Sequence, residues 1–172
     1  MRVMLRIVEY GWSLVLNSES NLRACFLLFL GGGVIVCVYS KKRCHYCDFP
    51  IDTIGHGRSQ IATDKMRRYV DTLLLEVEVL SKLLKAIGFD PSTHIFNTVY
   101  FGGGTPSLLP AVMLEQVIRS VQENLGQVCP VQTEMTLEID PGTFDRFSLS
   151  IWRRLGFNRY SVGVQSLDEV CI

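Results

Sequence analysis

The fold is organised around one stretch of the 172-residue sequence, SKKRCHYCDFP at residues 40–50, which directly follows an apolar run from Val34 to Tyr39. A short apolar run bounded by a polar loop is typical of a parallel strand that is buried on both faces. The loop holds the one close pair of cysteines in the sequence, Cys44 and Cys47. Two thiolates with C-x-x-C spacing can bind one metal ion or iron–sulfur cluster, but they rarely complete such a site alone.

The region after this loop has the pattern of one long amphipathic helix. Between residues 66 and 87, apolar side chains recur at intervals of three and four residues, which places them on one helix face. Thr63 or Asp64 is expected to cap the start of this helix. Gly88 stands where a residue in the left-handed conformation commonly ends a helix. The pattern thus predicts the first strand–helix unit of the chain.

Two further strand–helix units and a fourth strand are expected downstream. The strands are predicted at residues 98–101, 135–139 and 160–164. One helix should begin near Pro110 and end at Gly126, and a shorter helix should be capped by Thr143 and end before Gly156. Strands that alternate with helices form parallel sheets. The sequence therefore predicts an α/β fold with an open or barrel-like parallel sheet, whose ligand sits at the carboxyl ends of the strands.

Four loops are expected to meet at that edge, because each follows a predicted strand. Besides the cysteine loop, they are residues 102–106, 138–141 and 163–166. The glycines Gly102–Gly104 allow positive φ angles and a close approach of the backbone to a ligand, although a flexible turn would also use them. Glu138 could accept hydrogen bonds from ribose hydroxyls or an amine, or could be solvated or ion-paired. Gln165 could bind the same ligand.

Composition and charge limit the classes of function. The 17 basic and 17 acidic residues cancel, which argues against a nucleic-acid-binding surface driven by bulk charge. Most of the six cysteines are scattered, which favours a reducing compartment over a disulfide framework. The uncharged run at residues 24–39 is shorter than the roughly 20 residues of a membrane span, so no span is expected. Residues 1–33 match neither a signal peptide nor the repeating unit, so they form an atypical N-terminal segment before a domain at residues 34–172.

The end of the sequence predicts a chain that is cut short. Ser166 and Glu169 form a capping box that announces a helix, but the sequence stops at Ile172. Four parallel strands are also too few to close a barrel, which takes about eight in the best-known case. We therefore expect a partial barrel that is truncated after its fourth strand.

Four motifs together resemble the radical S-adenosylmethionine (radical SAM) family. They are KRCHYCDFP at 42–50, FGGGTPS at 101–107, EIDPGT at 138–143 and GVQS at 163–166. Within that family they are similar to the oxygen-independent coproporphyrinogen III oxidase-like branch, which contains the HemW-type heme chaperones. The resemblance covers roughly residues 36–172. It implies a partial (β/α)6 barrel of radical SAM type, a [4Fe–4S] cluster held by C-x3-C-x2-C, and S-adenosylmethionine bound to the cluster.

The same resemblance implies roles for individual residues. Cys44 and Cys47 match the second and third cluster ligands, and Tyr46 matches the residue beside the adenine. The remaining matches are all contacts to S-adenosylmethionine, and they are Gly103, Gly104, Thr105, Glu138 and Gln165.

The first cluster ligand is missing from the expected position. That position is occupied by Ser40, and Cys37 lies three residues too early. The lead-in to the first cysteine that is usual in the family is also missing, which suggests a wrong or alternative first exon. A serine hydroxyl is a poorer iron ligand than the thiolates that usually hold such clusters. We therefore expect that the chain as given does not hold a stable [4Fe–4S] cluster.

The resemblance implies a function in heme or porphyrin metabolism. Members that oxidise coproporphyrinogen usually have a further cysteine where this sequence has Phe49, so the heme chaperone branch is favoured. Such a protein would bind heme or porphyrin and pass heme to an accepting protein, in the cytoplasm or, if eukaryotic, in mitochondria. One alternative is a coproporphyrinogen III dehydrogenase. The other is a dithiol redox module or a zinc site completed by His56, Cys37 or Cys129.

Overall fold

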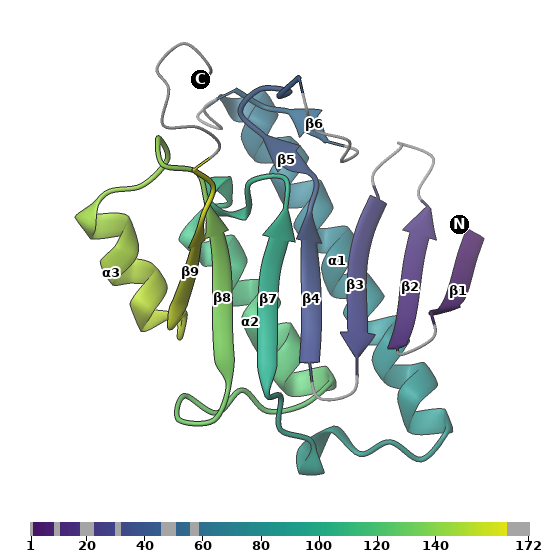
Figure 1. Cartoon of the computed structure of the whole chain (residues 1–172). Helices are drawn as coiled ribbons and strands as arrows, with labels where there is room; N and C mark the ends of the chain where they lie inside the picture. Colours follow the sequence, from purple (N-terminus) through teal and green to yellow (C-terminus); the bar gives the residue numbers. More distant parts are fainter. Residues whose placement is uncertain are drawn as a thin grey trace.

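The core of the molecule is a seven-stranded sheet with the strand order β1-β2-β3-β4-β7-β8-β9 (Figure 1). Its four consecutive parallel strands are β4 (Gly32–Cys37), β7 (Thr98–Gly103), β8 (Glu134–Ile139) and β9 (Arg159–Val162). These are the four strands that the sequence predicts, so the α/β class with a parallel sheet is confirmed. A computed structural model describes residues 2–8, 11–17, 23–29, 32–45, 51–55 and 59–164.

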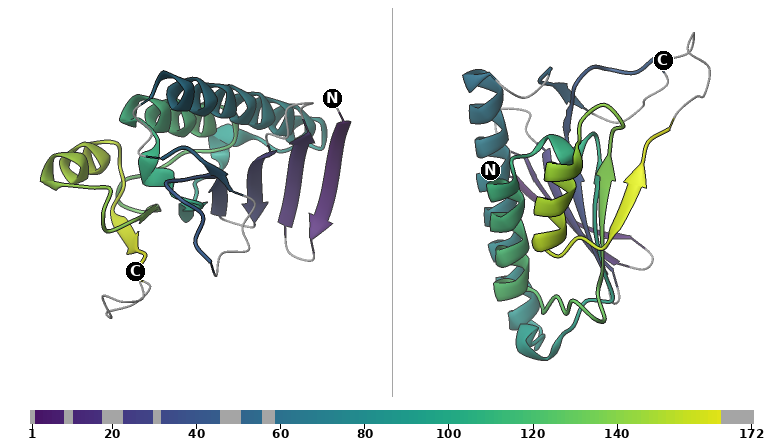
Figure 2. Two further views of the ribbon diagram at one scale, coloured as in Figure 1. Left: turned by 90° about the horizontal axis from the view of Figure 1, so that it is seen from above. Right: turned by 90° about the vertical axis from the view of Figure 1, so that its left-hand side faces the viewer.

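Three helices cover one face of the sheet. They are α1 (Gln60–Ala86), α2 (Ala111–Asn124) and α3 (Arg146–Arg154), and all three lie on the same side in both views of Figure 2. Single turns of 3-10 helix, η1 (Pro91–Thr93) and η2 (Pro106–Leu108), stand before and after β7. In the part of the chain that the structure describes, the opposite face carries no helix. We call it the inner face, because it would line the inside of a barrel.

Residues 1–33, to which no element was assigned from sequence, contribute strands to the same sheet. They form β1 (Arg2–Val8), β2 (Gly11–Asn17) and β3 (Arg23–Phe29), which pair antiparallel with one another. β3 also pairs antiparallel with β4. The parallel part of the sheet is therefore extended at its β4 edge by an antiparallel meander. A separate two-stranded ladder joins β5 (Tyr39–Ser40) to β6 (Asp52–Thr53) above β4.

The apolar stripe of α1 forms the centre of the core. Its buried members are at most 6% exposed, and they are Met66, Tyr69, Val70, Leu73, Val77, Leu80 and Leu84. α1 packs against β3 and α2, and the Tyr69 hydroxyl donates a hydrogen bond to the Val36 carbonyl of β4. Burying each of these side chains contributes about 1.5–3 kcal/mol. Leu83 and Ile87, which the periodicity placed on the stripe, are instead 44% and 70% exposed.

The start of α1 differs from the sequence prediction. The N-cap is Ser59, whose side chain accepts a hydrogen bond from the Ala62 amide at 3.1 Å, so the prediction of Thr63 or Asp64 was wrong. The first turn of α1 contains Ile61, which is 73% exposed and does not belong to the apolar stripe. The periodicity of the stripe therefore does not show that the helix already begins there. The predicted end is confirmed, because Gly88 has φ +90° and its amide donates to the Lys85 carbonyl of the last helical turn.

The start of α3 also differs. Its N-cap is Asp145, whose carboxylate accepts from the Ser148 amide at 2.7 Å, so Thr143 does not cap the helix. The Thr143 hydroxyl donates instead to the Asp140 carbonyl at 2.7 Å and closes the turn after β8. Helices that could span a membrane are not found among the described residues, since none is long and apolar enough.

Candidate functional site

The loop after β4 and the glycine loop after β7 are joined backbone to backbone. The Gly104 amide donates to the Cys37 carbonyl at 2.7 Å, and the Thr105 amide donates to the Tyr39 carbonyl at 2.6 Å. Tyr39 is itself anchored, because its buried ring packs edge-on against Tyr69 and its hydroxyl donates to a carbonyl in α1. The two loops that the sequence predicts to share a site are thus fixed to each other at the carboxyl edge of the sheet.

The loop after β8 joins the same site through side chains. The Lys41 ammonium donates to the Gly142 carbonyl at 3.2 Å, which links the cysteine loop to the turn after β8. The hydroxyls of Ser107 and Thr143 lie 3.1 Å apart, which links that turn to the glycine loop. Three of the four predicted loops therefore meet, as the alternation of strands and helices predicts.

All three glycines of the glycine loop are packed against the protein itself. Gly103 has φ +105°, and a Cβ there would lie 2.5 Å from the Cys37 carbonyl oxygen. A Cβ on Gly104 would collide with the Tyr39 carbonyl oxygen. A Cβ on Gly102 would lie 2.5 Å from the Tyr100 ring. The expected positive φ is found at Gly103. The contacts of all three glycines hold the loop in one conformation, so it is not a flexible turn.

Glu138 binds the glycine loop from β8. Its Oε2 accepts a hydrogen bond from the Gly103 amide at 2.9 Å, and its Oε1 accepts one from the Tyr100 hydroxyl. The carboxylate is therefore held by two hydrogen-bond donors. It is neither the fully solvated group nor the ion-paired group that the sequence left as alternatives. A carboxylate has about four acceptor sites, so two remain for a ligand. Burial, followed by the hydrogen bond to Glu138, raises the pKa of the Tyr100 phenol, which keeps it a donor at neutral pH.

The cysteines near the site differ in their surroundings. Cys44 is partly buried in the loop after β5, whereas Cys37 is 2% exposed at the end of β4. Burial raises the pKa of the Cys37 thiol from 9.0 to about 12, so it is protonated at neutral pH. The Ser40 hydroxyl donates to the Lys42 carbonyl at 3.0 Å. The other predicted contacts, Cys47, Tyr46 and Gln165, lie outside the described residues.

Cys129 lies at the other end of the sheet. It precedes β8, and its amide donates to the Thr133 hydroxyl, which in turn donates to the Phe96 carbonyl just before β7. A six-residue strand spans roughly 20 Å, so Cys129 cannot share a metal ion with the cysteine loop. The proposed zinc ligand Cys129 is therefore wrong, and His56 lies outside the described residues. Within those residues there is no cluster of three or more side chains suited to a metal ion.

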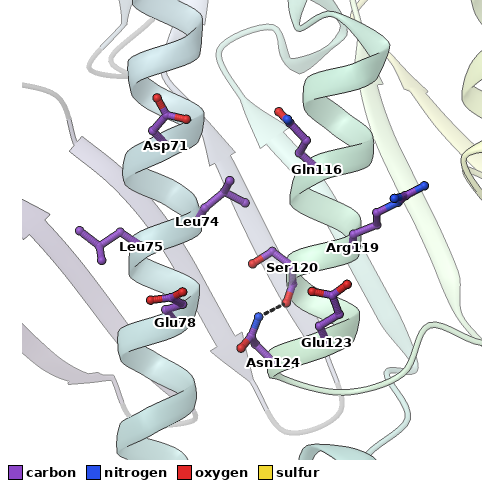
Figure 3. A pocket seen from close by; sticks show the side chains of 9 residues that line it. All are labelled: Asp71, Leu74, Leu75, Glu78, Gln116, Arg119, Ser120, Glu123 and Asn124. Atoms are coloured by element: carbon purple, nitrogen blue, oxygen red, sulfur yellow. Dashed lines mark hydrogen bonds between the residues drawn. The ribbon is translucent and has the colours of Figure 1, made fainter.

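A hollow of about 510 Å³ lies between α1 and α2 on the helical side of the sheet (Figure 3). Most of its lining residues are polar, and Leu74 on α1 points toward α2, which contributes Gln116 and Ser120. None of the described candidate residues is among the nine that line it. The hollow is therefore separate from the site at the carboxyl edge.

Four residues that contribute to the site were not predicted from sequence. They are Lys41, Tyr100, Ser107 and Thr143. For Tyr100 the sequence carried a signal, because residues two apart in a strand share a face and Gly102 leaves space beside it. The contacts of the other three depend on loop conformations that the local sequence does not determine.

Comparison with known proteins agrees with this arrangement. The profile of the Radical SAM superfamily matches residues 34–171, which include most of β4 and the whole of β7, β8 and β9. The chain is 38% identical over 131 residues to the heme chaperone HemW of Synechocystis sp., a match that covers 76% of this chain and 29% of that protein. It is 33% identical over 131 residues to the mitochondrial radical S-adenosyl methionine domain-containing protein 1 of Bos taurus, covering 76% of this chain and 26% of that protein.

A solved structure supports the same relationship. Coproporphyrinogen III oxidase (HemN) from Escherichia coli superposes with a TM-score of 0.64 and 25% sequence identity, over 80% of this chain and 28% of that chain. The chain spans less than a third of the length of each of these relatives. The resemblance predicted from the four motifs is confirmed, and with a profile match over well more than half of its residues, this chain belongs to the radical SAM superfamily.

Proposed function

We propose that the chain is the S-adenosylmethionine-binding part of a HemW-like protein that binds heme or porphyrin and hands heme to an accepting protein. The observation that carries the proposal is the contact between the glycine loop and Glu138 at the edge where the loops meet. The heme chaperone HemW supports it as the relative at 38% identity. The proposed compartment is the cytoplasm, or the mitochondrion by analogy with the Bos taurus relative.

The described residues fit the amino-acid end of S-adenosylmethionine. The amides of Gly103, Gly104 and Thr105 already donate within the protein, so they fix the conformation of the glycine loop rather than bind the ligand. The two spare acceptor sites of Glu138 suit an ammonium group or hydroxyls. The hydrogen bonds from Tyr100 and Gly103 hold the Glu138 carboxylate in place. When bound, S-adenosylmethionine supplies radical chemistry in this class of protein.

The residues present do not fit a [4Fe–4S] cluster. The resemblance assigns Cys44 and Cys47 as the second and third ligands, but Ser40 occupies the first ligand position, where its hydroxyl donates a hydrogen bond to the Lys42 carbonyl. Cys37 stands three residues before Ser40, and its thiol is buried and protonated at neutral pH. We therefore derive no reaction step through a cluster and propose that this chain does not hold a stable one.

Iron content tests that proposal. The unmodified chain, Ser40→Cys and Cys37→Ser are reconstituted anaerobically with iron and sulfide, and iron per chain is counted. We expect little iron in the unmodified chain, a partial gain in Ser40→Cys and no change in Cys37→Ser. Close to four irons, the content of a [4Fe–4S] cluster, that are lost in Cys37→Ser would show that Cys37 is a ligand. About one zinc without iron would favour the zinc-binding alternative.

A second candidate, a coproporphyrinogen III oxidase, is favoured by the structural match to that enzyme. Binding distinguishes the two candidates without requiring turnover. The chain is titrated with hemin, followed by the Soret band, and separately with coproporphyrinogen III under anaerobic conditions. Tighter binding of hemin is the result expected for a heme chaperone, and tighter binding of coproporphyrinogen III would favour the oxidase. Binding of neither would contradict a heme-binding role for this chain.

A further inference from the structure

A line of hydrogen bonds joins two neighbouring strands on the inner face, and the proposed function uses only part of it. It runs from the Tyr100 hydroxyl on β7 to Glu138 on β8. It ends at the Gly103 amide, back on β7. Family resemblance assigns a role to Glu138 and Gly103 but not to Tyr100.

The position of the Tyr100 ring depends on Gly102. Residues 100 and 102 lie on the same face of β7, and any Cβ at Gly102 would lie 2.5 Å from Cε1 and 3.0 Å from Cδ1 of the ring. The same Cβ would lie 3.1 Å from the Glu138 carboxyl carbon. Gly102 therefore leaves the space through which the ring reaches across to the neighbouring strand.

Both carboxylate oxygens of Glu138 are thereby constrained. Without the phenol, Oε1 would lose the one donor that it has among the described residues, and that hydrogen bond would no longer oppose rotation of the carboxylate. The hydrogen bond from Gly103 to Oε2 would then hold the group alone. Charge-assisted hydrogen bonds of this kind are about twice as strong as neutral ones, so the phenol has a strong effect on the orientation.

We propose that Tyr100 is a positioning residue: its hydroxyl, in the space left by Gly102, fixes the Glu138 carboxylate so that Oε2 holds the glycine loop and the free acceptor sites face an ammonium-bearing ligand. The ligand part rests on the proposed function. The part that concerns Glu138 and the loop is a property of the protein alone. The two parts are therefore tested separately.

The ligand-free test follows the Gly103 amide in the 172-residue chain by hydrogen exchange and NMR. Tyr100→Phe keeps the ring and removes the hydroxyl, so we expect exchange at Gly103 to become roughly three- to tenfold faster. Tyr160→Phe is the matched control, because that tyrosine is also half-buried and its hydroxyl donates to the Phe157 carbonyl, away from Glu138. Unchanged exchange at Gly103 in Tyr100→Phe would overturn the proposal.

The ligand test uses S-adenosylhomocysteine, which carries the same amine and carboxylate as S-adenosylmethionine and needs no cluster for its measurement. Tyr100→Phe should weaken its binding roughly tenfold in calorimetry. In the Glu138→Ala background, the same substitution should change the affinity less than about twofold, because nothing is left to position. Equal weakening in both backgrounds would overturn the proposal.

The two tests distinguish a failure of the proposed function from a failure of the positioning role of Tyr100. If the unmodified chain does not bind S-adenosylhomocysteine, the proposed function is contradicted, and the exchange of the Gly103 amide decides the role of Tyr100 alone. If the chain binds the ligand but Tyr100→Phe alters neither measurement, the proposed function stands and the positioning role is wrong.

Discussion

At the scale of single residues, the position of the Tyr100 ring depends on the absence of a side chain at Gly102. Gly102→Ala places a methyl group against the Tyr100 ring. We expect a loss of about 1–3 kcal/mol in the free energy of unfolding, measured with urea, because the ring must shift. In a Tyr100→Ala background the same substitution should cost less than about 0.5 kcal/mol. An equal cost in both backgrounds would mean that the ring is not what Gly102 accommodates.

The buried Cys37 thiol predicts that the folded chain loses stability as the pH rises into the alkaline range. Its folded-state pKa of about 12 lies above its ordinary value of 9.0, so the folded chain binds this proton more tightly than the unfolded chain. The resulting stabilisation is complete below about pH 9 and is lost as the pH rises toward 12.

Cys37→Ala isolates this contribution from those of the tyrosines. From about pH 9.5 to about pH 10.5, the unmodified chain should lose about 1 kcal/mol more stability than Cys37→Ala. Urea unfolding at the two pH values measures the difference. Parallel losses would mean that the thiol ionises as readily in the folded chain as in the unfolded one.

At the scale of elements, the cap of α1 is the clearest point at which structure and sequence pattern disagree. Ser59→Ala removes the acceptor of the Ala62 amide and should lower the free energy of unfolding by about 1 kcal/mol. Asp64→Ala serves as the control, since it changes an exposed residue within the helix and should cost less than about 0.5 kcal/mol. Thermal unfolding of both variants distinguishes the two candidate caps.

The elements that could be predicted are those with a strong local signal. β4 and β7 are largely apolar, β8 and β9 alternate polar with apolar residues, and the stripe of α1 repeats over several turns. Ser59 and Asp145 were missed as caps because each stands before a first turn whose side chains are largely exposed. The hydrogen bond between Tyr100 and Glu138 joins residues 38 positions apart and depends on strand register, which periodicity alone does not give.

At the scale of the whole molecule, the sheet is unequally protected. β7 and β8 each pair with strands on both sides, whereas β9 pairs with β8 alone in the described part of the chain. We therefore expect backbone amides of β7 and β8 to exchange with solvent at least tenfold more slowly than those of β9, because local opening is easiest at a singly paired strand. Hydrogen–deuterium exchange with mass spectrometry measures this, and equal protection of the three strands would contradict it.

The packing of the three glycines bears on how such chains are recognised in genomes. Each glycine is required by a neighbouring carbonyl or ring of the protein itself. A descendant that had lost its cofactor would therefore still be selected to keep all three, simply in order to fold. We therefore expect the glycine triplet to record ancestry, and we propose that the residue at position 40, where the resemblance implies the first cluster ligand, reports on whether the metal chemistry has been retained.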